Sequence, residues 1–326
     1  MSTQSLLQSK EDEDLNNKHK HLIATIPRGN GWNIQHLYNY NGFWLAPVII
    51  KSNLFLHTSF KSKPTDIYLA SFMKSGTTWL KALMFSIINR DRYTFSDHYL
   101  LHHNPQSAFP FLDICDPVTN SEFSRPRLFS THFPHTLLPP CITSCKLVYV
   151  CRDPKDVLVS KWHFLNKHRS ENVPPLSLHE AFELFCEGVS HYGPVWEHVL
   201  SYWKASLESP EKILFLKYEE MMKQPAVEVR KLAAFMVKPF TDEEEEEGLV
   251  EKIVKLCSFE NLRNLEVNKK GAEQFSTVVK VENHEFFRKG EIGDWKNYLS
   301  VEMKERIDGI MNDKLNGSGL VLGSSS

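Results

Sequence analysis

The chain lacks the features that mark secreted, membrane-spanning or nucleic-acid-binding proteins. Its first residues are polar and contain neither the basic nor the apolar region of a secretory signal. No apolar run approaches the roughly 18 residues that a membrane span needs. The net charge of −2 gives no electrostatic reason to expect nucleic acid or an anionic membrane as a partner. These absences favour a cytoplasmic protein.

Cysteine is scarce and its spacing is uninformative, and no internal repeat is present. The six cysteines show no paired CxxC pattern, so we interpret them as reduced thiols rather than as a disulfide framework or a zinc site. A chain of 326 residues, 41% of them hydrophobic, can bury a large core. We expect a polar, disordered tail over residues 1–20 and one α/β domain over residues 21–326.

The most informative segment is DIYLASFMKSGTTWLKALMFSII, which spans residues 66–88. Its apolar spacing predicts a short strand from Ile67 and, after a tight turn over residues 74–78, a helix from Trp79. A helix start carries unpaired N–H groups and a partial positive charge, so this turn suits a phosphate or sulfate. The Walker A order does not fit, because Lys74 precedes Gly76 and no glycine stands among residues 70–73. That mismatch disfavours a nucleoside kinase.

The order Lys-Ser-Gly-Thr-Thr-Trp, from Lys74 to Trp79, instead resembles the phosphosulfate loop of the cytosolic sulfotransferases. The segments GWNIQHLYNYNGFWLAP, CSFENLRNLEVNKKG and DKLNGSGL resemble the plant cytosolic (soluble) branch of that family. Members of this family use 3′-phosphoadenosine 5′-phosphosulfate (PAPS) as the sulfo donor. The resemblance implies a single α/β domain with a central, mostly parallel sheet flanked by helices. It also implies that the donor is bound by the residues of the loop, which are Lys74, Ser75, Gly76, Thr77, Thr78 and Trp79.

Two further segments match the family's signatures in the same order. In LVYVCRDPKDVLVSKWHF, Arg152 ends a predicted buried strand and Ser160 lies eight residues on, in a predicted helix. In FFRKGEIGDW the matching triplet is Arg288, Lys289 and Gly290. The resemblance implies that these five residues hold the donor's 3′-phosphate. It also assigns a donor contact to Tyr218, within a strand predicted over Ile213–Glu219.

The resemblance identifies His132, in LFSTHFPH, as the base that deprotonates the acceptor hydroxyl. Histidine suits this role because its pKa, near 6.5, leaves it neutral enough to accept a proton. His135 is the competing candidate. The implied reaction is in-line displacement, with Lys74 stabilising the charge that grows on the leaving phosphate, and it needs no metal.

This chain departs from common family patterns at two positions. Met73 stands where many members have proline, and Ser130 stands where many animal members have a second lysine. These departures leave open a catalytically impaired protein that binds a nucleotide or a small ligand on the same fold. The sequence does not decide whether the two residues lower activity.

The expected acceptor is a small, largely apolar hydroxylated metabolite, such as a flavonoid or a steroid. Residues 264–285 are expected by resemblance to form a mobile cover over the site, and the protein is expected to be a monomer or a weak homodimer. The acidic run at residues 243–247 is interpreted as the start of a helix that continues through Leu256, with a capping box formed by Thr241 and Glu244. Aromatic candidates for the acceptor pocket are Trp44, Phe109, Phe111, Phe164 and Phe287.

Overall fold

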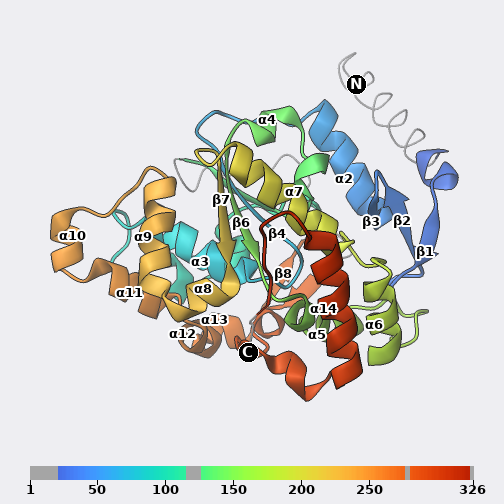
Figure 1. Cartoon of the computed structure of the whole chain (residues 1–326). Coiled ribbons are helices and arrows are strands. Elements are labelled where there is room, and N and C mark those ends of the chain that lie inside the picture. Colours follow the sequence, from blue (N-terminus) through green and yellow to red (C-terminus); the bar gives the residue numbers. More distant parts are fainter. Residues whose placement is uncertain (1–20, 115–125, 276–279, 324–326) are drawn as a thin grey trace, which may run out of the picture.

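A four-stranded parallel sheet forms the centre of the computed structural model, which describes residues 21–114, 126–275 and 280–323 (Figure 1). The predicted tail, 1–20, lies outside the described residues. The strand order is β5–β4–β6–β7, and all three pairings are parallel. The bounds are Ile67–Ser71 for β4, Leu128–Thr131 for β5, Lys146–Cys151 for β6 and Ile213–Lys217 for β7. The predicted α/β fold with a mainly parallel sheet is confirmed.

The strand order creates a switch point between β4 and β6. From β4 the chain first moves to β5 on one side and then crosses to β6 on the other. In open α/β sheets, ligands bind outside the carboxyl ends of the strands at such a point. The turn that follows Ser71 and the arginine that follows Cys151 both lie at this edge.

Helices cover both faces of the sheet, because side chains along each strand alternate in direction. Ile67 and Leu69 of β4 pack with α3, α9 and α11 in one core, whereas Tyr68 and Ala70 pack with α2, α5, α6, α7 and α14 in the other. Figure 1 shows α9–α11 on one side of the sheet and α2, α6 and α14 toward the other. The helices are α2 (Pro47–Thr58), α3 (Thr77–Ile88), α4 (Pro140–Thr143), α5 (Pro154–Lys167), α6 (Leu178–Cys186), α7 (Val195–Glu208), α8 (Tyr218–Lys223), α9 (Pro225–Phe235), α10 (Asp242–Glu246), α11 (Leu249–Leu256), α12 (Phe259–Asn264), α13 (Glu266–Lys269) and α14 (Val301–Leu315).

Two smaller sheets and several 3₁₀ turns complete the fold. An antiparallel sheet near the start pairs β1 (Arg28–Asn30), β2 (His36–Tyr40) and β3 (Phe43–Leu45). An antiparallel pair near the end joins β8 (Ala272–Gln274) and β9 (Lys280–Glu282). The 3₁₀ turns are η1 (Tyr99–Leu101), η2 (Pro105–Ala108), η3 (His135–Leu137), η4 (Asn283–Phe286) and η5 (Asp294–Asn297). No helix within the described ranges is long and apolar enough to cross a membrane.

Two predicted elements end earlier than expected. The strand predicted over Ile213–Glu219 stops at Lys217, because its neighbour β6 ends at Cys151, and Tyr218 instead begins α8. The acidic run does start a helix with the predicted capping box. That helix does not continue through Leu256, however. Gly248 adopts the left-handed conformation at φ 66° and separates α10 from α11.

Candidate active site

The turn between β4 and α3 has an unusual backbone. Lys74 has φ 69° and Gly76 has φ 112°, so the chain reverses tightly before Thr77 begins the helix. A side chain at Gly76 would also collide with Tyr218, since its Cβ would lie 2.8 Å from the Tyr218 ring. Both the positive φ and this close approach require glycine. The turn therefore presents the start of α3 beside Tyr218.

Lys74 lies where positive charges converge. Its ammonium nitrogen is 4.0 Å from the centre of the Phe164 ring. Burial, together with the charges of Arg288 and Arg152, lowers the pKa of Lys74 to about 7, while Glu285 opposes the shift. Repulsion among these cations makes an anion a favourable ligand here.

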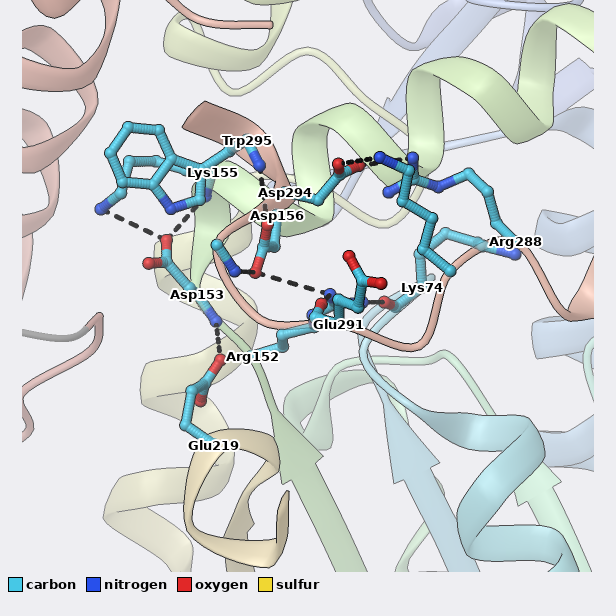
Figure 2. Close-up of polar contacts among 12 residues, drawn as sticks. Lys74, Arg152, Asp153, Lys155, Asp156, Glu219, Arg288, Glu291, Asp294 and Trp295 are labelled. Carbon is cyan, nitrogen blue, oxygen red and sulfur yellow. Dashed lines mark hydrogen bonds and ion pairs between the residues drawn. The ribbon is translucent and has the colours of Figure 1, made fainter. Parts of the chain in front are cut away.

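Arg152 follows β6 and reaches the same place. It donates to the backbone oxygen of Glu291 at 2.7 Å and lies 3.5 Å from the Asp156 carboxylate (Figure 2). Its guanidinium also stacks over Tyr218, 4.6 Å from the ring centre. Its Nε atom is enclosed and has no hydrogen-bond partner among the described residues. Ser160 lies on α5, as predicted, and lines the same cavity.

The loop that carries Arg288, Lys289 and Gly290 is held by two buried carboxylates. Asp294 pairs with Arg288 at 2.6 Å and also pairs with Lys289. Asp156 accepts hydrogen bonds from the backbone nitrogens of Gly293, at 2.8 Å, and Trp295, at 3.0 Å. Figure 2 shows Asp156 between Arg152 and this loop. The sequence reasoning missed both aspartates, although Asp156, in the first turn of the predicted helix and four residues after Arg152, was a usable signal.

Gly290 is a second position where only glycine fits. Its φ is 71°, and a Cβ there would lie 2.4 Å from the ring of Phe259 on α12. The Arg288 Nε atom, like that of Arg152, is enclosed without a partner among the described residues. The two arginines therefore have donor capacity that the protein itself does not use.

His132 follows β5 and its ring is oriented by the backbone. Its Nδ1 atom lies 2.7 Å from the Ser71 carbonyl oxygen, which can only accept, so Nδ1 donates and Nε2 carries the lone pair. Burial lowers the pKa of His132 to about 3, although the bond to Ser71 opposes the shift. The imidazole is therefore neutral at physiological pH and able to accept a proton.

Residues that the sequence did not reveal fix the backbone at His132. Its N–H donates to buried Asp113 at 2.8 Å, and its carbonyl accepts from His198 at 2.8 Å. Tyr192 packs its ring 5.4 Å from the His132 ring. His135 lies elsewhere, with its ring against Tyr202.

A cavity of about 700 Å³ joins these groups. The cavity is lined by His132 and by all the predicted donor-binding residues except Ser75, which is buried; those that line it are Lys74, Gly76, Thr77, Thr78, Trp79, Arg152, Ser160, Tyr218, Arg288, Lys289 and Gly290. Phe111, Phe164 and Phe287 line it as well, whereas Trp44 and Phe109 do not. The Phe109 ring instead packs 5.0 Å from the buried ammonium of Lys81.

The segment predicted as a cover lies at this cavity. Phe275 and Val281 are among its lining residues, and residues 276–279 lie outside the described residues. Glu285 pairs with His168 at the end of α5, at 2.7 Å. Of the two departures from the family pattern, Met73 lines the cavity, and Ser130 turns its hydroxyl to the Pro110 carbonyl at 3.1 Å.

No cluster of three or more possible metal ligands is present within the ranges that the structure describes. The arrangement instead offers several cations and a helix start at the switch point. The neutral imidazole of His132 lines the same cavity. This combination suits transfer of an anionic group between two bound molecules.

Comparison with known proteins agrees with this arrangement. The sulfotransferase domain model matches residues 64–319. Cytosolic sulfotransferase 17 of Arabidopsis thaliana is 44% identical over 325 residues, which cover 97% of this chain and 94% of the relative. The chain therefore belongs to the sulfotransferase family, and it is a transferase enzyme.

Solved structures show the same fold. A crystal structure of an Arabidopsis thaliana protein, described as a candidate steroid sulphotransferase, matches with a TM-score of 0.73 and 37% identity, covering 96% of this chain and 98% of that one. A mouse sulfotransferase complexed with PAP matches with a TM-score of 0.67 and 26% identity, covering 87% of this chain and 95% of that one.

Proposed function

We propose that this protein transfers a sulfo group from PAPS to a hydroxyl of a small, largely apolar metabolite, with His132 as the general base. One observation carries the proposal. A single cavity is lined both by Lys74, Arg152 and Arg288 and by His132, whose Nδ1 atom is held by the Ser71 carbonyl. We would not expect a core that only stabilises the fold to place three cations and a neutral histidine at one cavity.

The residues present fit the two anionic groups of the donor. The turn at Lys74–Thr78 and the start of α3 would hold the 5′-phosphosulfate, because helix starts and cations bind anions. Arg152, Ser160, Arg288 and Lys289 would hold the 3′-phosphate. Arg152 and Arg288 both line the cavity, which supports this assignment. Tyr218 and Trp79, whose rings meet at 5.7 Å, would flank the nucleotide.

Lys74 would stabilise the phosphate oxygen that departs as the sulfo group moves to the acceptor in line. Its lowered pKa matters here, since an anion beside it would restore the charged form. His132 would take the acceptor proton at Nε2. A negative charge bound near Lys74 would also raise the pKa of His132 and make it a stronger base.

The acceptor would be bound by an apolar wall. The Phe111 ring meets the His132 ring edge at 4.9 Å, and Phe275 packs against Phe111 at 6.3 Å. Such a wall suits a ring-containing molecule, such as a flavonoid or a steroid, and the similar Arabidopsis structure is described as a candidate steroid sulphotransferase. We propose a cytoplasmic enzyme, in keeping with the cytosolic names of its relatives. We further propose that it acts without a metal, a membrane or nucleic acid, as a monomer or a weak homodimer.

One assay separates this proposal from its alternative. The purified protein should transfer label from sulfur-labelled PAPS to members of a mixed panel of phenols and hydroxysteroids. A catalytically impaired binding protein would bind PAP, which is PAPS without its sulfo group, in calorimetry but would form no product with any acceptor. Binding of neither PAP nor PAPS would refute the site assignment itself.

A further inference from the structure

Gln106 is a polar residue of the cavity that the donor site proposed above does not include. It lies in η2, and its side-chain nitrogen donates to the hydroxyl oxygen of Thr78 at 2.7 Å. Thr78 is in the first turn of α3, and both residues line the cavity without being fully buried. A side-chain amide from another element therefore contacts one of the hydroxyls that we assign to the 5′-phosphosulfate.

The direction of this bond decides what the Thr78 hydroxyl can offer to a ligand. A hydroxyl has one hydrogen to donate and two lone pairs that accept. Gln106 occupies one lone pair, so the hydrogen remains for another acceptor. In many helices a threonine donates this hydrogen to the carbonyl oxygen four residues earlier, which here belongs to Lys74. The hydrogen-bond partner of the Thr78 hydroxyl among the described residues is instead Gln106, which leaves the hydrogen free for an anion in the cavity.

The backbone of Gln106 is fixed from both sides. Its N–H donates to the side-chain oxygen of Asn104 at 2.8 Å, and its carbonyl accepts from the ammonium of Lys81 at 3.0 Å. Lys81 lies about one turn beyond Thr78, so α3 carries both groups that Gln106 contacts. Asn104 is only 1% exposed and itself donates to Asn268 at 2.8 Å. Gln106 is therefore held against the start of α3 before any ligand binds.

A hydroxyl that is already turned toward an anion binds it better than one that must first reorient. A hydrogen bond to a charged phosphate is stronger than one between neutral groups, so its geometry matters more. We propose that Gln106 is a positioning residue of the donor site, which directs the hydrogen of the Thr78 hydroxyl toward the phosphate of the 5′-phosphosulfate. The proposal rests on the proposed function and deepens it, because it adds a residue outside the turn at Lys74–Thr78 to the donor site.

The test compares two nucleotides that differ only at the 5′ end. PAP carries a phosphate there, whereas adenosine 3′-phosphate does not. Calorimetry measures the affinity for each, by competition with PAP for the weaker ligand. Gln106→Met has a side chain of similar length that cannot donate a hydrogen bond. It should bind PAP about tenfold more weakly than the wild type and adenosine 3′-phosphate equally well, because the lost contact concerns the 5′-phosphate alone.

Variants of Thr78 show whether the effect of Gln106 passes through the hydroxyl. In Thr78→Val there is no hydroxyl to orient, so adding Gln106→Met should change the affinity for PAP by less than about twofold. In Thr78→Ser, which keeps the hydroxyl, adding Gln106→Met should again cost about tenfold. Ser107→Ala is the matched control. It removes a hydrogen bond within η2, from Ser107 to the Asn104 carbonyl at 2.8 Å, and should leave both affinities unchanged.

Gln106→Glu provides a second variant in case Gln106→Met fails to fold. Its ionised carboxylate has nearly the size of the amide but can only accept a hydrogen bond. It should draw the Thr78 hydrogen toward itself and away from the ligand. The preference for PAP over adenosine 3′-phosphate should therefore fall at least as far as in Gln106→Met.

Equal losses of affinity for both nucleotides in Gln106→Met would overturn the inference, because Gln106 would then only support the fold. The full loss in the Thr78→Val background, or an unchanged preference for PAP in Gln106→Glu, would overturn it too. Failure of sulfo transfer has a different signature, in which PAP binds but no acceptor receives label. The comparison of the two nucleotides still decides the role of Gln106 in that case, and a wild type that binds neither nucleotide would overturn both proposals.

Discussion

Lys74 should take up a proton when the nucleotide binds. Its pKa is lowered to about 7 in the ligand-free protein, because burial and the neighbouring arginines disfavour the ammonium form. At pH 8, one unit higher, only about a tenth of the Lys74 side chains carry a charge. A phosphate bound beside the side chain favours the charged form and returns the pKa toward its ordinary value, above 9. Binding of PAP at pH 8 should then consume roughly 0.9 proton per site.

Calorimetry measures this uptake directly. PAP is titrated into the protein at pH 8 in two buffers whose ionisation enthalpies differ, and the difference in observed heat gives the number of protons exchanged. The PAP phosphates add little to this number at pH 8, since their second pKa lies near 6.

Two variants assign the proton to Lys74. Lys74→Met should abolish the uptake because it has no titratable group. Lys74→Arg should also show none, because arginine is charged before and after binding, but it should keep more of the affinity. An uptake near zero in the wild type, or a full proton in Lys74→Met, would refute the reasoning.

The remaining predictions concern the groups around the site. Arg288→Ala should erase much of the preference for PAP over adenosine 5′-phosphate in calorimetry, a loss of about 1.5 to 3 kcal/mol for a charge-assisted contact, and equal binding of both by the wild type would point to another ligand. Asp156→Asn should weaken PAP binding and lower the free energy of unfolding by about 1 to 3 kcal/mol, because one of two backbone donors loses its carboxylate acceptor. The buried rings of His191 and His198 have their pKa lowered to about 3, so the folded state binds fewer protons than the unfolded state between pH 3 and 6.5. Stability in urea should therefore fall as the pH drops below about 6.5, by up to about 1.4 kcal/mol per pH unit for each ring, and a flat profile would contradict the assignment. A chelator should leave sulfo transfer unchanged, whereas its loss would require a metal.

Local chemistry made much of the fold and of the donor site predictable. The strand at Ile67, the turn at Gly76 and the helix through Trp79 follow from apolar spacing and from a glycine in a tight turn, although the helix begins at Thr77, two residues earlier than predicted. The carboxyl ends of parallel strands meet at one edge, so Lys74 and Arg152 could be expected together. The roles of these residues in catalysis remain predictions.

Contacts between residues distant in the chain could not be predicted from the sequence. The bonds that fix His132 come from Asp113 and His198, which are distant in the chain and carry no local signal. Trp44 and Phe109 were candidates for the cavity on residue type alone, and only the packing shows that they do not line it. The break at Gly248, by contrast, had a local signal, because glycine between two helical segments is a common stop.

The central claim is that His132 acts in the chemical step and not in nucleotide binding. The turnover of two histidine variants tests this claim most directly. His132→Ala should keep its fold and its affinity for PAP, because the proposed mechanism places the acceptor, not the nucleotide, at the imidazole. Its turnover with labelled PAPS should fall by about two to four orders of magnitude, as expected when a positioned proton acceptor is removed. His135→Ala should lose little, because His135 packs against Tyr202 instead of lining the cavity. Near-normal turnover in His132→Ala, or the large loss in His135→Ala instead, would contradict the proposed mechanism.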